Sequence, residues 1–126
     1  MNLNPEMQEE IVRLGHLKNA AAAIVDYVRA VSPESDFKPC NAFYDWQLKP
    51  DTWIHLSFSF NYPTVRISLA VQLGMLPDHT GLKAELGRRN NWSRLYLKSA
   101  KQLPVVFKCI EYAYSHSSNK HGKRHG

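Results

Sequence analysis

Residues 53–73 of this 126-residue chain, WIHLSFSFNYPTVRISLAVQL, contain two runs in which apolar and polar side chains alternate. The apolar members occupy every second position on both sides of a short break: Ile54, Leu56, Phe58 and Phe60, then Val65, Ile67, Leu69, Val71 and Leu73. Successive side chains of a strand point to opposite faces, so each run predicts a strand with one apolar face. The Asn61-Tyr62-Pro63 break predicts the turn of a β-hairpin.

Two further strands are predicted, one on each side of the hairpin in sequence. Asn41–Leu48 is rich in aromatic strand formers, and in Trp92–Lys98 two leucines alternate with aromatic and basic residues. Residues 32–40 contain two prolines and several small polar residues, which predicts a connecting loop.

A long amphipathic helix is predicted before the strands. Asn4 is a typical N-cap, Pro5 suits the first helical position, and apolar residues then recur at spacings of three and four as far as Val31. Gly15 interrupts this stripe and is a point where the helix could bend, and Pro33 ends it. Because the stripe is close to a heptad repeat, it could pack on the chain's own sheet or on a second copy.

Two more helices are expected in the second half. Asp78 or Thr80 can cap a short helix that carries Leu82 and Leu86 and ends at Gly87. A final helix is predicted from about Pro104, with an apolar face formed by Val106, Ile110 and Ala113.

These elements predict one α+β domain over residues 1–114 with the order α-β-β-β-α-β-α. We expect two layers: a mainly antiparallel four-stranded sheet, with the helices on its aliphatic face. Residues 115–126 contain three histidines and three basic residues but no large apolar side chain, which predicts a disordered basic tail. A tail of this composition is a poor metal site, so no metal is expected.

Charge is distributed unevenly along the chain. Residues 83–126 contain ten lysines and arginines but only two acidic residues, whereas residues 1–82 contain six basic and nine acidic residues. A one-sided positive charge favours attraction to anionic partners. We therefore expect a nucleic acid or an acidic protein surface as the partner.

The polar face of the predicted sheet combines aromatic and basic side chains. Such a face suits single-stranded nucleic acid, because bases stack on rings while cations hold phosphates. An exposed sheet face must be polar whatever its function, so an ordinary solvated surface is the alternative interpretation. The candidate binding residues are Trp53, His55, Arg66, Arg88, Arg89, Trp92, Arg94, Tyr96 and Lys98.

Enzymatic signatures are not found in the sequence. Neither a phosphate-binding glycine loop nor a nucleophile elbow occurs, so no cofactor is expected. Asp45, Asp51 and Glu85 lack the carboxylate-to-lysine spacing of a metal-dependent nuclease. Cys40 has no histidine near it in sequence, and the two cysteines suggest reduced structural thiols rather than a disulfide or zinc site.

Residues 53–114 show two resemblances, carried by the polar hairpin, the Glu85-Leu86-Gly87 segment and the run from Trp92 to Leu97. This region is similar to accessory domains attached to restriction-type nucleases and to small double-wing α/β proteins associated with DNA. Neither resemblance includes an invariant motif, so no family is assigned. Both would imply a nucleic-acid-binding domain without catalysis.

The sequence thus predicts a non-enzymatic, nucleic-acid-associated binding module. The alternative is a small protein-binding factor, of the inhibitor or immunity type, that docks on an acidic partner. No apolar run reaches the roughly 20 residues of a membrane span, and no secretory signal is found, so we expect a cytoplasmic protein without membrane association. It is expected to be a monomer, or a homodimer formed through the N-terminal helix.

Overall fold

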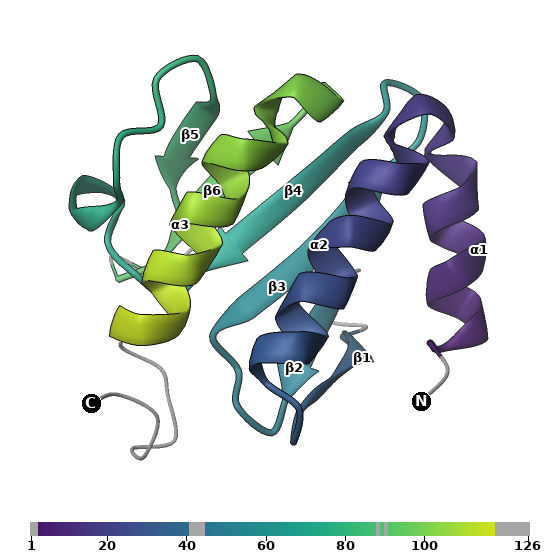
Figure 1. Ribbon diagram of the computed structural model, residues 1–126, viewed down its shortest axis with the longest axis horizontal. Helices are drawn as coiled ribbons and strands as arrows, with labels where there is room; N and C mark the ends of the chain where they lie inside the picture. Colours follow the sequence, from purple (N-terminus) through teal and green to yellow (C-terminus); the bar gives the residue numbers. More distant parts are fainter. Residues whose placement is uncertain (1–2, 41–44, 88, 90, 118–126) are drawn as a thin grey trace.

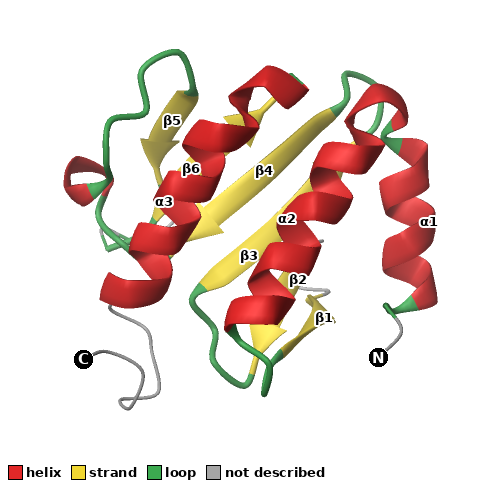
Figure 2. Cartoon of the chain, viewed as in Figure 1, coloured by secondary structure: helices red, strands yellow, loops and turns green. Residues whose placement is uncertain are grey.

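Six antiparallel strands form one sheet, and helices cover one of its faces (Figure 1, Figure 2). This computed structural model describes residues 3–40, 45–87, 89 and 91–117. The strands are β1 (Asp36–Cys40), β2 (Asp45–Lys49), β3 (Ile54–Ser59), β4 (Thr64–Leu69), β5 (Lys83–Leu86) and β6 (Ser93–Leu97). They lie in the order β1-β2-β3-β4-β6-β5, so the last strand of the chain is inserted between β4 and β5.

The N-terminal helical stripe is divided into two helices, α1 (Pro5–Arg13) and α2 (Lys18–Val31). The Asn4 side chain accepts a hydrogen bond from the Glu6 backbone N–H, which confirms the predicted cap. Gly15 begins the short 3-10 turn between the helices and has a φ of +61°, a conformation that favours glycine. Buried residues of α1 and α2 belong to the hydrophobic core of this chain. Most of the apolar stripe is therefore covered by the chain's own residues.

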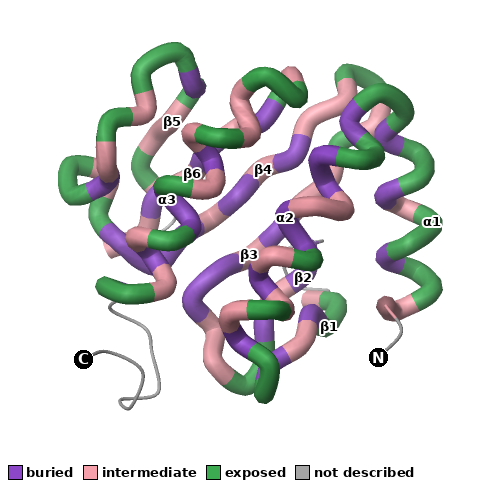
Figure 3. Tube along the Cα trace, viewed as in Figure 1, coloured by how far each residue is buried: buried purple, intermediate pink, exposed green. Residues whose placement is uncertain are grey.

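The central hairpin follows the predicted alternation. β3 and β4 are paired with Leu56 opposite Ile67 and His55 opposite Ser68, so apolar and polar side chains lie on opposite faces. Burial alternates along these strands in Figure 3. The strands predicted at residues 41–48 and 92–98 are confirmed as β2 and β6, although residues 41–44 lie outside the described part of the chain.

The expected four-stranded sheet is wrong, because two segments assigned to other structures are strands. Residues 36–40, predicted as loop, form β1, an edge strand in which Pro39 is tolerated. Residues 83–86, predicted as part of a short helix, form β5, which pairs with β6. The observed order is therefore two helices, six strands and a helix, in place of α-β-β-β-α-β-α.

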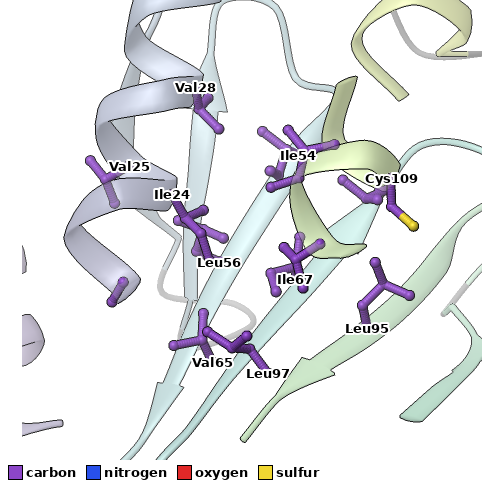
Figure 4. Close-up of a cluster of buried hydrophobic side chains, with 14 of the residues drawn as sticks. Ile24, Val25, Val28, Ile54, Leu56, Val65, Ile67, Leu95, Leu97 and Cys109 are labelled. Carbon is purple, nitrogen blue, oxygen red and sulfur yellow. The ribbon is translucent and has the colours of Figure 1, made fainter. Parts of the chain in front are cut away.

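The core lies between the sheet and the helices α2 and α3 (Leu103–His116). Figure 4 shows side chains from α2, β3, β4 and β6, together with Cys109 of α3, in this layer. The two helices lie side by side, and the rings of Tyr27 and Phe107 are 5.1 Å apart between them. The helix predicted from Pro104 is confirmed. It continues to His116, and residues 118–126 of the predicted tail lie outside the described residues.

Among the described residues, no helix is long and apolar enough to cross a membrane.

Candidate functional site

The sheet face turned away from the helices, here called the open face, presents two rows of register partners. His55, Ser68, Arg94 and Glu85 form one row across β3, β4, β6 and β5, and Ser57, Arg66, Tyr96 and Lys83 form the next. This arrangement follows directly from the period-two pattern, because the aliphatic residues between these positions point into the core. Polar, basic and aromatic groups are thereby collected on one surface.

A shallow hollow of about 520 Å³ lies beside the β3–β4 turn, on the side where β5 begins and β6 ends. Its lining residues are Ser59, Phe60, Asn61, Tyr62, Thr64, Lys83, Tyr96 and Lys98. The Tyr62 ring at the turn is 87% exposed, and Nζ of Lys83 lies 4.8 Å from the centroid of the Tyr96 ring. Two tyrosines and two lysines therefore line one depression.

Glu85 neutralises part of the positive charge beside this hollow. It accepts a hydrogen bond from the Tyr96 hydroxyl, and one of its oxygens lies 3.8 Å from Nη1 of Arg94. The Tyr96 hydrogen bond, followed by the charges of Lys83 and Arg94, holds the pKa of Glu85 below its ordinary value. Burial, followed by the bond to Glu85, raises the pKa of Tyr96. Glu85 therefore offsets part of the charge of Lys83 as well as that of Arg94.

His55 belongs to a second polar group on the open face. Its Nδ1 atom lies 3.2 Å from Oδ2 of Asp45, and the Trp92 ring meets the imidazole edge-on at a centroid distance of 5.1 Å. Oδ1 of Asp45 and Nε of Arg66 are both buried and have no hydrogen-bond partner in the part of the chain that the structure describes. Trp92 therefore shields one side of the His55–Asp45 pair, whereas Arg66 lies in the neighbouring row opposite Tyr96.

The predicted binding residues are only partly brought together. His55, Arg66, Arg94 and Tyr96 lie on the open face, Trp92 packs against His55, and Lys98 lies at the hollow. Arg89 is exposed in the turn before β6, and Arg88 lies outside the described residues.

Trp53 does not lie on the open face. The prediction that placed it among the residues of that face is wrong. The side chain is fully buried on the helical side, where its ring is 5.4 Å from that of Tyr114. Its Nε1 donates a hydrogen bond to Oγ of Ser32 at 3.2 Å. The chain is irregular just before β3 begins at Ile54, so the alternation does not extend back to this tryptophan.

Tyr62, Lys83 and Asp45 are site residues that sequence reasoning missed. The sequence assigns Tyr62 only to the turn, and a single aromatic residue in a turn carries no signal of binding by itself. The pattern of residues 78–87 predicts a short helix around Lys83, whereas the structure pairs Lys83 with Tyr96 in the sheet. Asp45 reaches His55 only through the register of β2 with β3, which a single sequence does not reveal.

The residues considered for catalysis remain dispersed. Three strands, β3, β4 and β6, separate Asp45 on β2 from Glu85 on β5, so these carboxylates do not form a nuclease cluster. Asp78 accepts hydrogen bonds from the backbone N–H and hydroxyl of Thr80. Within the described ranges, no group of three or more His, Cys, Asp or Glu residues is arranged to hold a metal ion.

No protein-family model matches this chain, and neither the curated proteins nor the solved structures contain a significant match.

Proposed function

We propose that the protein is a non-enzymatic binding module that holds single-stranded nucleic acid against the open face. The observation that carries the proposal is the hollow, where the rings of Tyr62 and Tyr96 are accompanied by the ammonium groups of Lys83 and Lys98. Base stacking on aromatic rings contributes about 1–3 kcal/mol per base and tolerates any sequence, because every base has a π-face. The lysines supply phosphate contacts as mobile point charges.

The charge of the hollow supports an anionic ligand. Within the described part of the chain, the ion pairs join Arg29 to Asp36, His55 to Asp45 and Arg94 to Glu85, and none of them engages Lys83 or Lys98. Both lysines are exposed, so a phosphate can approach without breaking an internal pair. The open, shallow form of the hollow suits a flexible strand whose bases are already unpaired.

The proposal is tested by fluorescence anisotropy with labelled single-stranded DNA and RNA of about 12 nucleotides, a length within the usual site sizes. The test variant is Lys83→Glu/Lys98→Glu. Its control, Lys18→Glu/Lys108→Glu, changes the net charge equally but alters exposed lysines on α2 and α3. We expect the hollow variant to lose at least tenfold in affinity and the control to lose less than threefold.

Salt dependence provides a second measurement. The logarithm of the binding constant should fall linearly with the logarithm of salt concentration, and the hollow variant should reduce that slope by about 1.4, or about 0.7 for each lost phosphate contact. Equal losses in both variants would show only nonspecific attraction, and no binding by the unmodified protein at low salt would reject the proposal. In that case, capture of an acidic protein from nuclease-treated lysate would favour the alternative function.

A further inference from the structure

The segment that contains β5 has a sequence pattern that is symmetrical about its central residue. Residues 82–86 read LKAEL, with a leucine at each end, alanine at the centre, and one positive and one negative residue between them. A strand with this pattern is complementary to an antiparallel copy of itself, because reversing it exchanges lysine for glutamate and leaves the apolar positions unchanged.

This segment lies at an edge of the sheet, where such complementarity can be used. β5 is the terminal strand beside β6, and its described backbone forms no hydrogen bond apart from those of that pairing and the following turn. The opposite edge, β1, contains Pro39, which lacks the N–H donor and discourages a further strand. β5 contains no proline and Leu86 at its end is 63% exposed, but the chain's own loop flanks this edge, with the 3-10 turn Leu73–Met75 close to β5.

One antiparallel register satisfies every cross-strand pair. With the two-fold axis at Ala84, Lys83 of each copy faces Glu85 of the other, and Leu86 faces Leu82. Centring the axis on Glu85 or on Lys83 instead places like charges opposite each other, which is unfavourable. A shift by a single residue turns the apolar side chains to the other face of the sheet. The side chains therefore specify both the orientation and the register.

We propose that a second copy of this chain pairs with β5, so that one antiparallel sheet continues across a two-fold axis. Charge complementarity identifies the occupant, because a self-complementary strand matches its own copy in an isologous interface. The loop that leads into β5 runs beside this edge in Figure 1, and pairing with a second copy requires this loop to move aside. This movement would break the hydrogen bond that the Gln102 side chain donates to the Gly81 carbonyl.

The expected dimer is weak. One short strand pair buries much less than the roughly 1,000 Å² of a stable interface, so we expect a dissociation constant on the order of 0.1–1 mM. In this two-fold arrangement, the helices of both copies lie on the same side of the continuous sheet. The two hollows, each lined by Lys83 close to the axis, would then lie on the same face.

Sedimentation equilibrium without nucleic acid, at protein concentrations up to about 1 mM, tests this pairing separately from the proposed function. We expect Lys83→Glu and Glu85→Lys each to be monomeric, because every cross-strand pair then joins like charges. An equimolar mixture of the two variants should regain the dimer mass, since the charges are complementary again. The double variant Lys83→Glu/Glu85→Lys should also dimerise with itself.

Circular dichroism confirms that each variant is folded before its mass is measured. A monomeric unmodified protein at the highest concentration would overturn the proposal. So would a dimer that persists in both single variants, which would place the interface elsewhere, for example on α1. Recovery of the dimer only in the mixture and in the double variant would support pairing through β5.

Discussion

Nδ1 of His55 and Oδ2 of Asp45 lie 3.2 Å apart on the open face, and the Asp45 side chain is only 5% exposed. Its second carboxylate oxygen is buried without a partner among the described residues. Desolvating a carboxylate in this way opposes folding, and a single neighbouring imidazole offsets only part of the cost. Asp45 is therefore poorly explained as a stabilising residue.

Asp45→Asn should leave stability nearly unchanged. The amide keeps the shape of the side chain and removes the cost of burying a charge, so we expect the free energy of unfolding to change by less than about 1 kcal/mol. Urea denaturation measures this, with Leu56→Ala as a core reference expected to lose about 2–5 kcal/mol. A loss above about 2 kcal/mol in Asp45→Asn would show that the ion pair stabilises the fold.

Tyr62→Ala should separate binding from stability. The ring is 87% exposed, so its removal should change the free energy of unfolding by no more than about 0.5 kcal/mol. Loss of one stacked base should weaken single-strand binding by about 1–3 kcal/mol, or roughly 5- to 150-fold. Anisotropy titrations check this, and Tyr62→Phe, which keeps a ring, should bind nearly normally. Equal affinity in Tyr62→Ala and the unmodified protein would remove this ring from the site.

Trp53→Phe should lower stability without changing nucleic-acid binding. The substitution removes the hydrogen bond to Ser32 and leaves a cavity beneath α3, so we expect a loss of about 1–3 kcal/mol in unfolding free energy. Nucleic-acid affinity should be unchanged, because the side chain lies on the helical side. Weaker binding at full stability would return Trp53 to the candidate site.

Alkaline pH should destabilise the protein partly through Cys109. Burial raises the pKa of this thiol from 9.0 to about 11, so the folded state holds the proton where the unfolded chain has released it. The resulting contribution to stability is present below pH 9 and is lost as the pH rises toward 11. Thermal denaturation between these pH values should show a shallower decline for Cys109→Ala than for the unmodified protein. Parallel declines would exclude this thiol as a cause.

The parts of the fold that could be predicted are those in which local pattern and tertiary structure agree. The hairpin at residues 54–69 has strict alternation, and the Asn4 cap and Pro104 mark helix ends by local chemistry. The two missed strands lack such agreement. The spacing of Leu82 and Leu86 suits a helix, but the segment between Gly81 and Gly87 is too short to form a stable one, and β6 offers it a ladder of hydrogen bonds.

The candidate site was harder to predict than the fold. Alternation correctly placed Arg66, Arg94 and Tyr96 on one face. It could not show that Glu85 engages Arg94 or that Asp45 reaches His55, because both contacts depend on strand order and register. It also could not show that Tyr62 and Lys83 share a hollow, since 20 residues separate them in the chain and only the sheet brings them together.

The insertion of β6 between β4 and β5 also determines the order in which the sheet can be completed. β1 to β4 follow each other in both sequence and space, so they can pair as each is synthesised. β5 emerges from the ribosome before its partner β6, and it can join the sheet only through β6. During that interval the edge of β4 is uncovered, and an uncovered strand edge in a nascent chain is prone to association with other chains. The nascent protein is therefore most exposed to misassembly just before residue 97 is available.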